Sequence, residues 1–246
     1  MNELFIRGLK HARMADGAMY PYDIPAVHDI ESITFSSPVA FFVGENGSGK
    51  STVLEAIAVT AGFNAEGGTK NYNFSTENST SELANTLTLI RGARREKSGF
   101  FLRAESFYTT ANYTEKGTFP AGDTPAPLFF DDKPMHQQSH GEAFMAIVNG
   151  FQPGLFLFDE PESALSPQRL LQLMVQIHEL AKRGSQFIIA THSPILLAYP
   201  GAQIYEFTQL GVQVTRFEEL DHVNVTRNFL NNPGSFLKEL FEDQQR

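Results

Sequence analysis

The chain of 246 residues contains no cysteine. Disulfide bonds, thiolate metal sites and cysteine nucleophiles are therefore excluded, and the composition is typical of the reducing cytoplasm, where we expect this protein. Long apolar runs are also missing, because "LFLF" and "FIIA" fall far short of the roughly 20 residues that span a bilayer. The N-terminal stretch "MNELFIRGLKHAR" is interrupted by charges, so we expect neither a signal peptide nor membrane insertion.

Positive charge is scarce. The chain has 19 Lys and Arg residues but 28 Asp and Glu residues, which gives a formal net charge of −9. A surface that binds along nucleic-acid phosphates usually has more basic than acidic residues, so extensive DNA binding is not supported. One local basic run is either a contact for DNA or an acidic partner, or an ordinary solvated face; it consists of Arg91, Arg94, Arg95, Lys97 and Arg103.

The order of apolar and polar segments predicts a single α/β domain over residues 1–246. Strands are expected in residues 1–43, helices over 50–61 and 167–183, and a mostly parallel sheet with flanking helices from residue 141 onwards. The polar, loop-rich stretch 63–138 is interpreted as an inserted lobe. Residues 221–246 are expected to form an acidic helical tail.

Residues 44–52 read "GENGSGKST" and directly follow the apolar run "VAFFV". They fit the phosphate-binding pattern Gly-x4-Gly-Lys-Ser/Thr, in its required place between a strand and a helix. Glycines let the backbone approach an anion closely, and the loop amides attract it together with the helix N-terminus. Lys50 supplies charge for the β- and γ-phosphates, and the Ser51 hydroxyl is suited to bind Mg²⁺. A plain glycine-rich turn is the alternative, which the flanking elements disfavour. The expected nucleotide site comprises Gly44, Glu45, Asn46, Gly47, Ser48, Gly49, Lys50, Ser51 and Thr52.

Two further apolar strands end in polar residues. "LFLFDE" places Asp159 and Glu160 at the carboxyl end of a predicted parallel strand, where open α/β sheets bind ligands. Asp159 is suited to hold Mg²⁺, and Glu160 to orient or deprotonate the attacking water. "ATHSP" places His192 at the end of the next strand, within reach of a γ-phosphate or a bound water.

In this order, the segments resemble the ATP-binding cassette (ABC) class of P-loop ATPases, over about residues 35–207. "GENGSGKST" is similar to the Walker A motif, "LFLFDE" to Walker B with its catalytic glutamate, "PESALSP" to the D-loop, and "ATHSP" to the switch-histidine region. The motifs are more similar to the soluble SMC/RecF-like branch, often described as AAA-type predicted ATPases, than to transporter subunits. The resemblance implies an ABC-type head with an N-terminal antiparallel β portion. It also implies ATP and Mg²⁺ as ligands, and Glu160, His192 and Lys50 as catalytic residues.

The segment "QSHGEAF" stands where this class carries its signature motif. Gln138 and His140 replace the usual leucine and first glycine, whereas Ser139 and Gly141 match. In this class the signature of one subunit completes the ATP site of another. The resemblance therefore implies a homodimer in which Ser139 and Gly141 contact ATP bound by the partner copy.

One feature of the class is missing, since residues 51–136 contain no glutamine to serve as the Q-loop residue. Glu105 is the candidate replacement because a carboxylate also binds Mg²⁺, and a surface glutamate on an edge strand is the equal alternative. Tyr20 and Tyr22 in "YPYDIP" are either adenine-stacking residues or part of an ordinary loop.

Three functions follow from the resemblance. The first is a soluble ATPase in DNA maintenance or anti-phage defence, working with a partner such as a nuclease or toxin. The second is the nucleotide-binding subunit of an ABC transporter, which the missing glutamine and the altered signature disfavour. The third is a non-hydrolysing, ATP-dependent regulatory scaffold, which Glu160 disfavours. A Ras-like GTPase is excluded, because no Asn-Lys-x-Asp motif is present.

Overall fold

The computed structural model describes residues 3–11, 20–28, 30–70, 82–103 and 140–242. Its strands are β1 (Ile6–His11), β2 (Ser32–Thr34), β3 (Val39–Gly44), β4 (Leu87–Arg91), β5 (Gly99–Arg103), β6 (Leu155–Asp159), β7 (Gln186–Ala190), β8 (Gln203–Thr208) and β9 (Gly211–Thr215). Its helices are α1 (Pro25–His28), α2 (Lys50–Ala61), α3 (Glu82–Thr86), α5 (His140–Asn149), α6 (Pro167–Lys182), α7 (Pro194–Leu197), α8 (Asp221–Asn231) and α9 (Pro233–Glu242), with the 3-10 turns η2 (Pro161–Ala164) and η3 (Phe217–Glu219).

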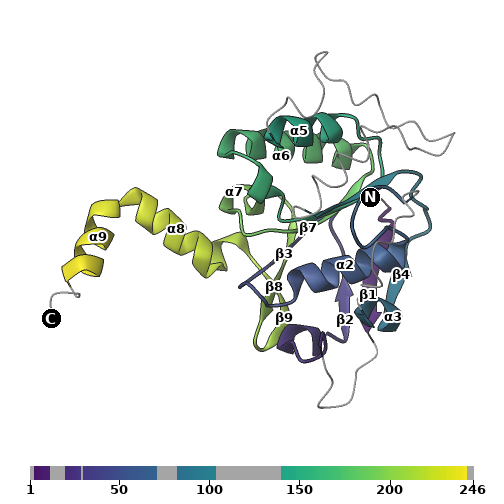
Figure 1. The fold of residues 1–246 in the computed structure, drawn as a ribbon, viewed down its shortest axis with the longest axis horizontal. Coiled ribbons are helices and arrows are strands. Elements are labelled where there is room, and N and C mark those ends of the chain that lie inside the picture. The colour runs from purple at the N-terminus through teal and green to yellow at the C-terminus, as the bar shows by residue number, and fades with distance from the viewer. Residues whose placement is uncertain (1–2, 12–19, 29, 71–81, 104–139, 243–246) are drawn as a thin grey trace.

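The central sheet has six strands in the order β5-β6-β7-β3-β8-β9 (Figure 1). Strands β5 to β8 run parallel, and β9 pairs antiparallel with β8 at one edge. Strands β3, β6 and β7 are apolar and buried nearly throughout, as expected for parallel strands covered on both faces. The expectation of an α/β fold with a mostly parallel sheet is confirmed. Because parallel strands end at the same edge, the residues that follow β3, β6 and β7 come together there.

A second sheet contains β2, β1 and β4, all antiparallel, and confirms the expected N-terminal antiparallel portion. Two strands of the stretch predicted to form an inserted lobe over 63–138 belong to these sheets instead. Strand β4 pairs with β1, and β5 pairs with β6. The expectation of a separate lobe is therefore wrong for these strands, since both pairings join segments far apart in sequence. Residues 71–81 and 104–138 of that stretch lie outside the described residues.

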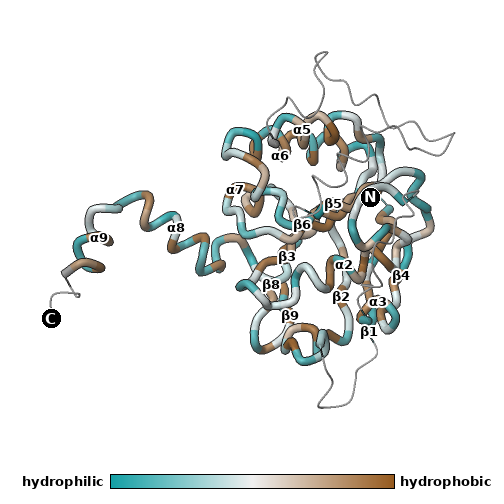
Figure 2. The backbone as a smooth tube through the Cα atoms, viewed as in Figure 1, coloured by the Kyte–Doolittle hydropathy of each residue, from teal (hydrophilic) through white to brown (hydrophobic). Residues whose placement is uncertain are grey.

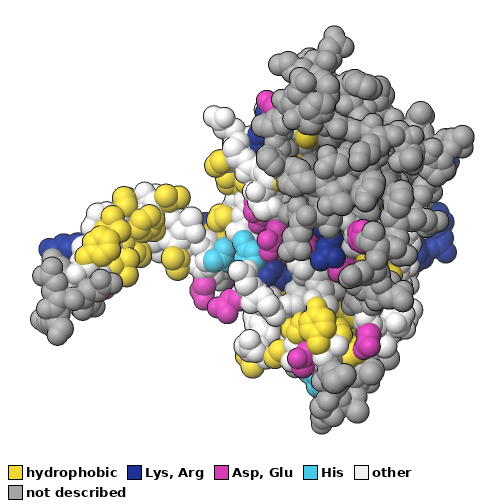
Figure 3. Space-filling view, in the orientation of Figure 1, with side chains coloured by type: hydrophobic (Ala, Val, Ile, Leu, Met, Phe, Trp, Pro, Cys, Tyr) yellow, Lys and Arg dark blue, Asp and Glu magenta, His cyan; other side chains and the backbone are white. Residues whose placement is uncertain are grey.

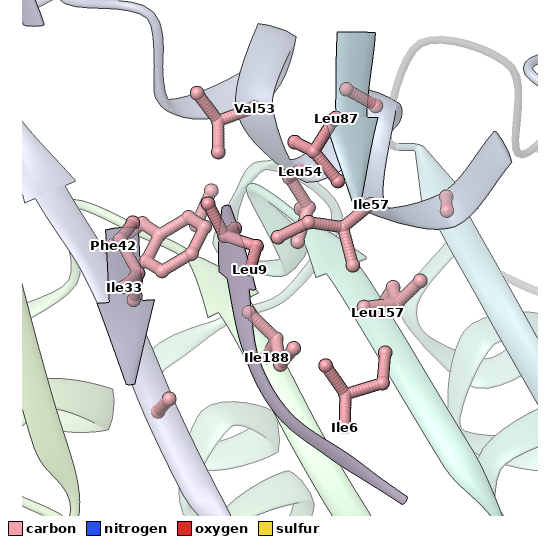
Figure 4. Close-up of a cluster of buried hydrophobic side chains, with 14 of the residues drawn as sticks. Ile6, Leu9, Ile33, Phe42, Val53, Leu54, Ile57, Leu87, Leu157 and Ile188 are labelled. Carbon is pink, nitrogen blue, oxygen red and sulfur yellow. The ribbon is translucent and has the colours of Figure 1, made fainter. Parts of the chain in front are cut away.

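Helix α2 packs between the two sheets, because it contacts β4 on one side and β3, β6 and β7 on the other. Its Leu54 and Ile57 are fully buried with Leu9 and Ile188 (Figure 4). Burying such an aliphatic side chain stabilises the fold by about 1.5–3 kcal/mol. Helices α5, α6 and α7 cover the opposite face of the central sheet, where their apolar residues form a second core with Phe156 and other strand residues.

Helices α8 and α9 form the predicted helical tail over most of residues 221–242 and project from the body of the protein (Figure 1). Within the described ranges, no helix combines the length and the apolar content that a membrane span needs.

Candidate functional site

The loop between β3 and α2 carries the phosphate-binding pattern at the expected edge of the sheet. Lys50 is the first residue of α2 and is only 4% exposed. Its Nζ donates hydrogen bonds to the carbonyl oxygens of Gly44 and Glu45, both at 2.8 Å. Burial lowers the pKa of Lys50, whereas the nearby carboxylates of Glu160 and Asp159 oppose that shift. The ammonium group is thus held at the loop, next to two acidic groups.

The backbone of this loop leaves donors for an anion. Gly49 has a φ of +96° and directly precedes α2, and no side chain caps this helix. The first N–H groups of a helix lack intrahelical partners, so this end is suited to bind nucleotide phosphates. The Ser48 hydroxyl is also buried without a hydrogen-bond partner among the described residues. Glu45, Asn46 and Gly47 form the exposed tip of the loop.

The residues expected to bind Mg²⁺ from two separate motifs meet in space. The Ser51 Oγ donates to the Asp159 Oδ1 at 2.8 Å, across 108 positions of sequence. Within the described residues, no group of three or more His, Cys, Asp or Glu side chains gathers as a metal cage. Mg²⁺ in nucleotide sites usually takes one or two protein oxygens, with waters and phosphates as its other ligands. The pair therefore fits this metal.

Glu160 has a special backbone conformation. It is the one non-glycine residue with a positive φ in the described chain, at φ 48° and ψ 53°. Such a conformation costs about 1–3 kcal/mol and is found mainly at functional sites. The Glu160 N–H donates to the Ala190 carbonyl at 2.9 Å, and its Oε1 lies 3.8 Å from the Nε2 of His192. The two side chains proposed for catalysis thus lie next to each other, and both are partly exposed.

His192 is neutral over a wider pH range than an exposed histidine. Burial lowers its pKa, the Lys50 charge lowers it further, and Glu160 opposes the shift. Its Nε2 is buried without a hydrogen-bond partner among the described residues. A neutral imidazole with a free ring nitrogen can donate to or accept from a ligand, according to its tautomer.

Glu162 in the turn η2 holds the segment that carries His192. Its Oε1 accepts from the Thr191 hydroxyl at 2.7 Å and from the His192 backbone N–H at 2.5 Å. Burial raises the pKa of Glu162, although these hydrogen bonds oppose the shift. Glu162 was not predicted, because the sequence shows only an acidic side chain in the D-loop-like segment and no spacing links it to Thr191.

A second histidine, also missed, stands beside the site. His222, in the first turn of α8, has its ring centroid 6.5 Å from that of His192, with the ring planes at 71°. Its Nε2 is likewise buried and has no partner among the described residues. Burial lowers the pKa of His222, the His192 charge lowers it further, and Glu206 and Asp221 oppose these effects. Figure 3 shows histidine and acidic side chains gathered at the root of the projecting helices.

The two tyrosines near residue 20 have different environments. Tyr20 is exposed, and its hydroxyl lies 3.5 Å from the Thr52 Oγ1, at the end of the phosphate loop. Tyr22 is buried, hydrogen-bonded to Thr86 at 3.1 Å and stacked on His11. Only Tyr20 therefore has a free ring near the nucleotide site.

The described part of the signature-like segment, from His140 onwards, forms the start of helix α5. Gly141, near the start of α5, packs on the D-loop-like segment, because a Cβ there would lie 3.3 Å from the Ala164 carbonyl oxygen and 3.0 Å from the Arg169 Cδ. Helix α5 covers the face of the central sheet opposite α2 (Figure 1). Ser139 and Glu105 lie outside the described residues.

The basic run is partly used inside the protein. Arg103 pairs with Glu55 at 2.8 Å, and Arg91 pairs with Glu96 at 3.4 Å. Arg94 lies over the Phe5 ring, and Arg95 and Lys97 are exposed. The run is therefore not a continuous free cationic face.

The fold and this set of residues are similar to those of ABC-type P-loop ATPase domains. Comparisons with known proteins agree, because residues 23–115 match the family described as "AAA domain" and residues 143–198 match "AAA domain, putative AbiEii toxin, Type IV TA system". The resemblance inferred from the motifs is confirmed at the level of this class.

Two curated relatives are ATP-binding proteins of transporters. The energy-coupling factor transporter ATP-binding protein EcfA2 of Methanospirillum hungatei is 27% identical over 204 residues, which cover 74% of this chain and 49% of that protein. EcfA of Methanocaldococcus jannaschii is 30% identical over 79 residues, covering 31% and 28% respectively. This chain thus spans less than half of the length of these relatives.

Comparison with solved structures gives one match with a similar fold and a second, weaker match. MJ1267, titled an ATP-binding cassette of an ABC transporter, matches with a TM-score of 0.53 and 16% identity, over 88% of this chain and 93% of that chain. The SmcHead bound to the C-winged helix domain of ScpA matches with a TM-score of 0.48 and 14% identity, over 86% and 97%. At this identity the first match shows the fold alone.

Proposed function

We propose that this protein binds ATP with Mg²⁺ and hydrolyses it, as an ABC-type ATPase that works as an ATP-bridged homodimer. The observation that carries the proposal is the 2.8 Å hydrogen bond between Ser51 and Asp159, beside Lys50 and next to the Glu160–His192 pair. The groups needed to bind phosphate, to bind the metal and to activate water thus lie together at one edge of the sheet.

Each residue has a distinct chemical task. Lys50 and the first turn of α2 bind the phosphates, and the exposed Tyr20 ring offers a stacking surface for adenine. Ser51 and Asp159 would hold Mg²⁺, which would supply positive charge to neutralise the nucleotide phosphates. Glu160 takes the proton of the attacking water, and His192 contacts the γ-phosphate or that water.

Support for the dimer comes from the position of Gly141. Because α5 and α2 cover opposite faces of the sheet, the signature-like segment is better placed to serve a second copy than its own phosphate loop. Ser139 and Gly141 then contact the γ-phosphate held by the partner copy. Hydrolysis removes this bridging group and loosens the dimer, as in other γ-phosphate switches.

The wider process that we infer is DNA maintenance or anti-phage defence in the cytoplasm, with a protein partner such as a nuclease or toxin. Support comes from the resemblance of the motifs to the soluble branch and from a matched family whose description names a toxin system. The internal pairing of Arg91 and Arg103 favours a protein partner over direct DNA contact. ATPase rates measured with and without DNA at increasing salt test this point, because phosphate contacts weaken steeply with salt.

A second candidate function is the ATP-binding subunit of a transporter, which the names of the curated relatives favour. It requires a membrane partner that docks on this chain. Co-purification with a permease encoded by a neighbouring gene would support this alternative.

Glu160→Gln tests the proposed activity. We expect ATP binding to persist while turnover falls about 100-fold or more, because the water loses its general base. Isothermal titration and a phosphate-release assay measure the two quantities, and Glu179→Gln, an exposed carboxylate on α6, is the matched control. Wild-type turnover in the Glu160→Gln variant would contradict the assigned base.

A further inference from the structure

Residues 221–242, which we call the C-terminal arm, leave the body of the protein. At its root only Leu220 and Val223 are buried, and from Val225 to Phe241 every residue except Phe229 is exposed. Figure 1 shows α8 and α9 extending away from the sheets and their covering helices.

The arm carries an apolar face that the described chain does not cover. On α9, Phe236, Leu237, Leu240 and Phe241 recur at the spacing of one helix face, and the last two are 58% and 61% exposed. Figure 2 marks hydrophobic positions along both helices, and Figure 3 shows hydrophobic side chains gathered on the projecting arm. The rings of Phe229 and Phe236, 6.0 Å apart, join α8 to α9. The face is therefore continuous across the two helices.

Helices of this length need a surface to pack on. Helix α8 has 11 residues and α9 has 10, whereas isolated helices shorter than about 12–15 residues are marginal in water. Most helical stability in proteins comes from packing of the apolar face, and α9 contacts α8 while its Leu240 and Phe241 stay exposed. The arm thus requires a partner surface.

We propose that the apolar face of the arm docks on a second copy of this chain. This inference rests on the ATP-bridged dimer proposed above. The arm starts at the nucleotide site, where His222 lies beside His192, and this is the face on which the second copy sits in that dimer. The docking surface is thus continuous with the proposed interface.

The two helices of the arm are similar in length. At 1.5 Å per residue α8 and α9 are each about 15 Å long, and the arm bends between them (Figure 1). In a two-fold symmetric dimer both copies contribute the same apolar face, which adds to an interface that needs roughly 1,200–2,000 Å² to be stable.

Docking of the arm also affects the nucleotide site. His222 belongs to the first turn of α8, so a docked arm fixes its ring next to His192. Formation of the dimer and the geometry of the switch histidine are therefore coupled through this helix.

The double variant Leu237→Glu/Leu240→Glu tests the docking surface. Glutamate is a good helix former, so the two substitutions remove apolar side chains from the face without lowering the intrinsic helix propensity of α9. By sedimentation velocity with Mg²⁺ and a non-hydrolysable ATP analogue, we expect dimer dissociation constants about tenfold or more above wild type. The matched control, Leu210→Glu/Val214→Glu, changes two exposed apolar residues at β9 and should dimerise as wild type does.

Two further measurements separate this inference from the proposed function. Analogue affinity of the monomer should stay unchanged in the arm variant, and Ser139→Arg should block dimerisation in an otherwise unchanged chain. If Ser139→Arg blocks the dimer but Leu237→Glu/Leu240→Glu does not weaken it, arm docking is wrong and the ATP-bridged dimer stands. If wild type binds the analogue and stays monomeric, the dimer itself is wrong, and the arm inference is overturned with it.

Discussion

At the scale of single residues, the carboxylate of Glu162 connects the D-loop-like turn to the switch histidine. It accepts hydrogen bonds from Thr191 and from the His192 N–H, and the backbone of His192 therefore depends on it. We predict that Glu162→Ala lowers kcat about tenfold or more with little change in KM, because hydrogen bonds to a carboxylate contribute about 1.5–3 kcal/mol. Steady-state ATPase kinetics measure this effect. Glu162→Gln keeps an acceptor oxygen and should recover part of the rate; equal loss in both variants would contradict the positioning role.

Single residues of the site also differ in how well the sequence predicts them. Ser51, Asp159 and Glu160 were predicted because each occupies a defined place in a local motif, and the structure brings them together. Glu162 and His222 were missed because their roles depend on contacts across 29 residues or more, which no local spacing encodes.

At the scale of one element, helix α2 has a left-handed glycine at each end, and only one of them serves the nucleotide site. A Cβ on Gly49, at φ +96°, would lie 2.8 Å from the Val27 Cγ2, whereas a Cβ on Gly62, at φ +99°, would meet nothing within 4 Å. We predict that both alanine substitutions lower the free energy of unfolding by about 1–2 kcal/mol, because both positions strain an L-residue.

Only Gly49→Ala should also weaken ATP binding, by about tenfold, because it displaces the first turn that receives the phosphates. Calorimetric titration of both variants checks this difference, and equal ATP affinities would show that the loop tolerates the shift.

Helices and strands could be predicted where the residues that determine them are close together in the sequence. Helix α2 has the expected bounds, and α6 starts after Ser166, whose side chain accepts from the Arg169 N–H at 3.4 Å. Strands β4 and β5 were assigned to an inserted lobe because their surroundings in sequence are polar. Their partners, β1 and β6, lie far away along the chain, so only the folded structure shows that they complete the two sheets.

At the scale of the whole molecule, one buried and two partly buried histidines link stability to pH. Burial lowers the pKa values of His11, His192 and His222 below their ordinary value near 6.5. In the unfolded chain these groups take up protons as the pH falls through 6.5, whereas in the folded chain they do so only at lower pH. The unfolded state therefore binds more protons in that window, and stability must fall as the pH decreases through it.

We predict that the free energy of unfolding is highest above pH 6.5 and decreases from pH 6.5 downward, until the lowered pKa values are passed. Glu162 opposes the trend, because burial raises its pKa and its folded form gains protons first. Urea unfolding at pH 7.5, 6.5 and 5.5 measures the effect in wild type and in His11→Gln/His222→Gln. The variant lacks two of the three groups, so its stability should depend less on pH. An equal slope in both proteins would show that other groups control the stability in this range.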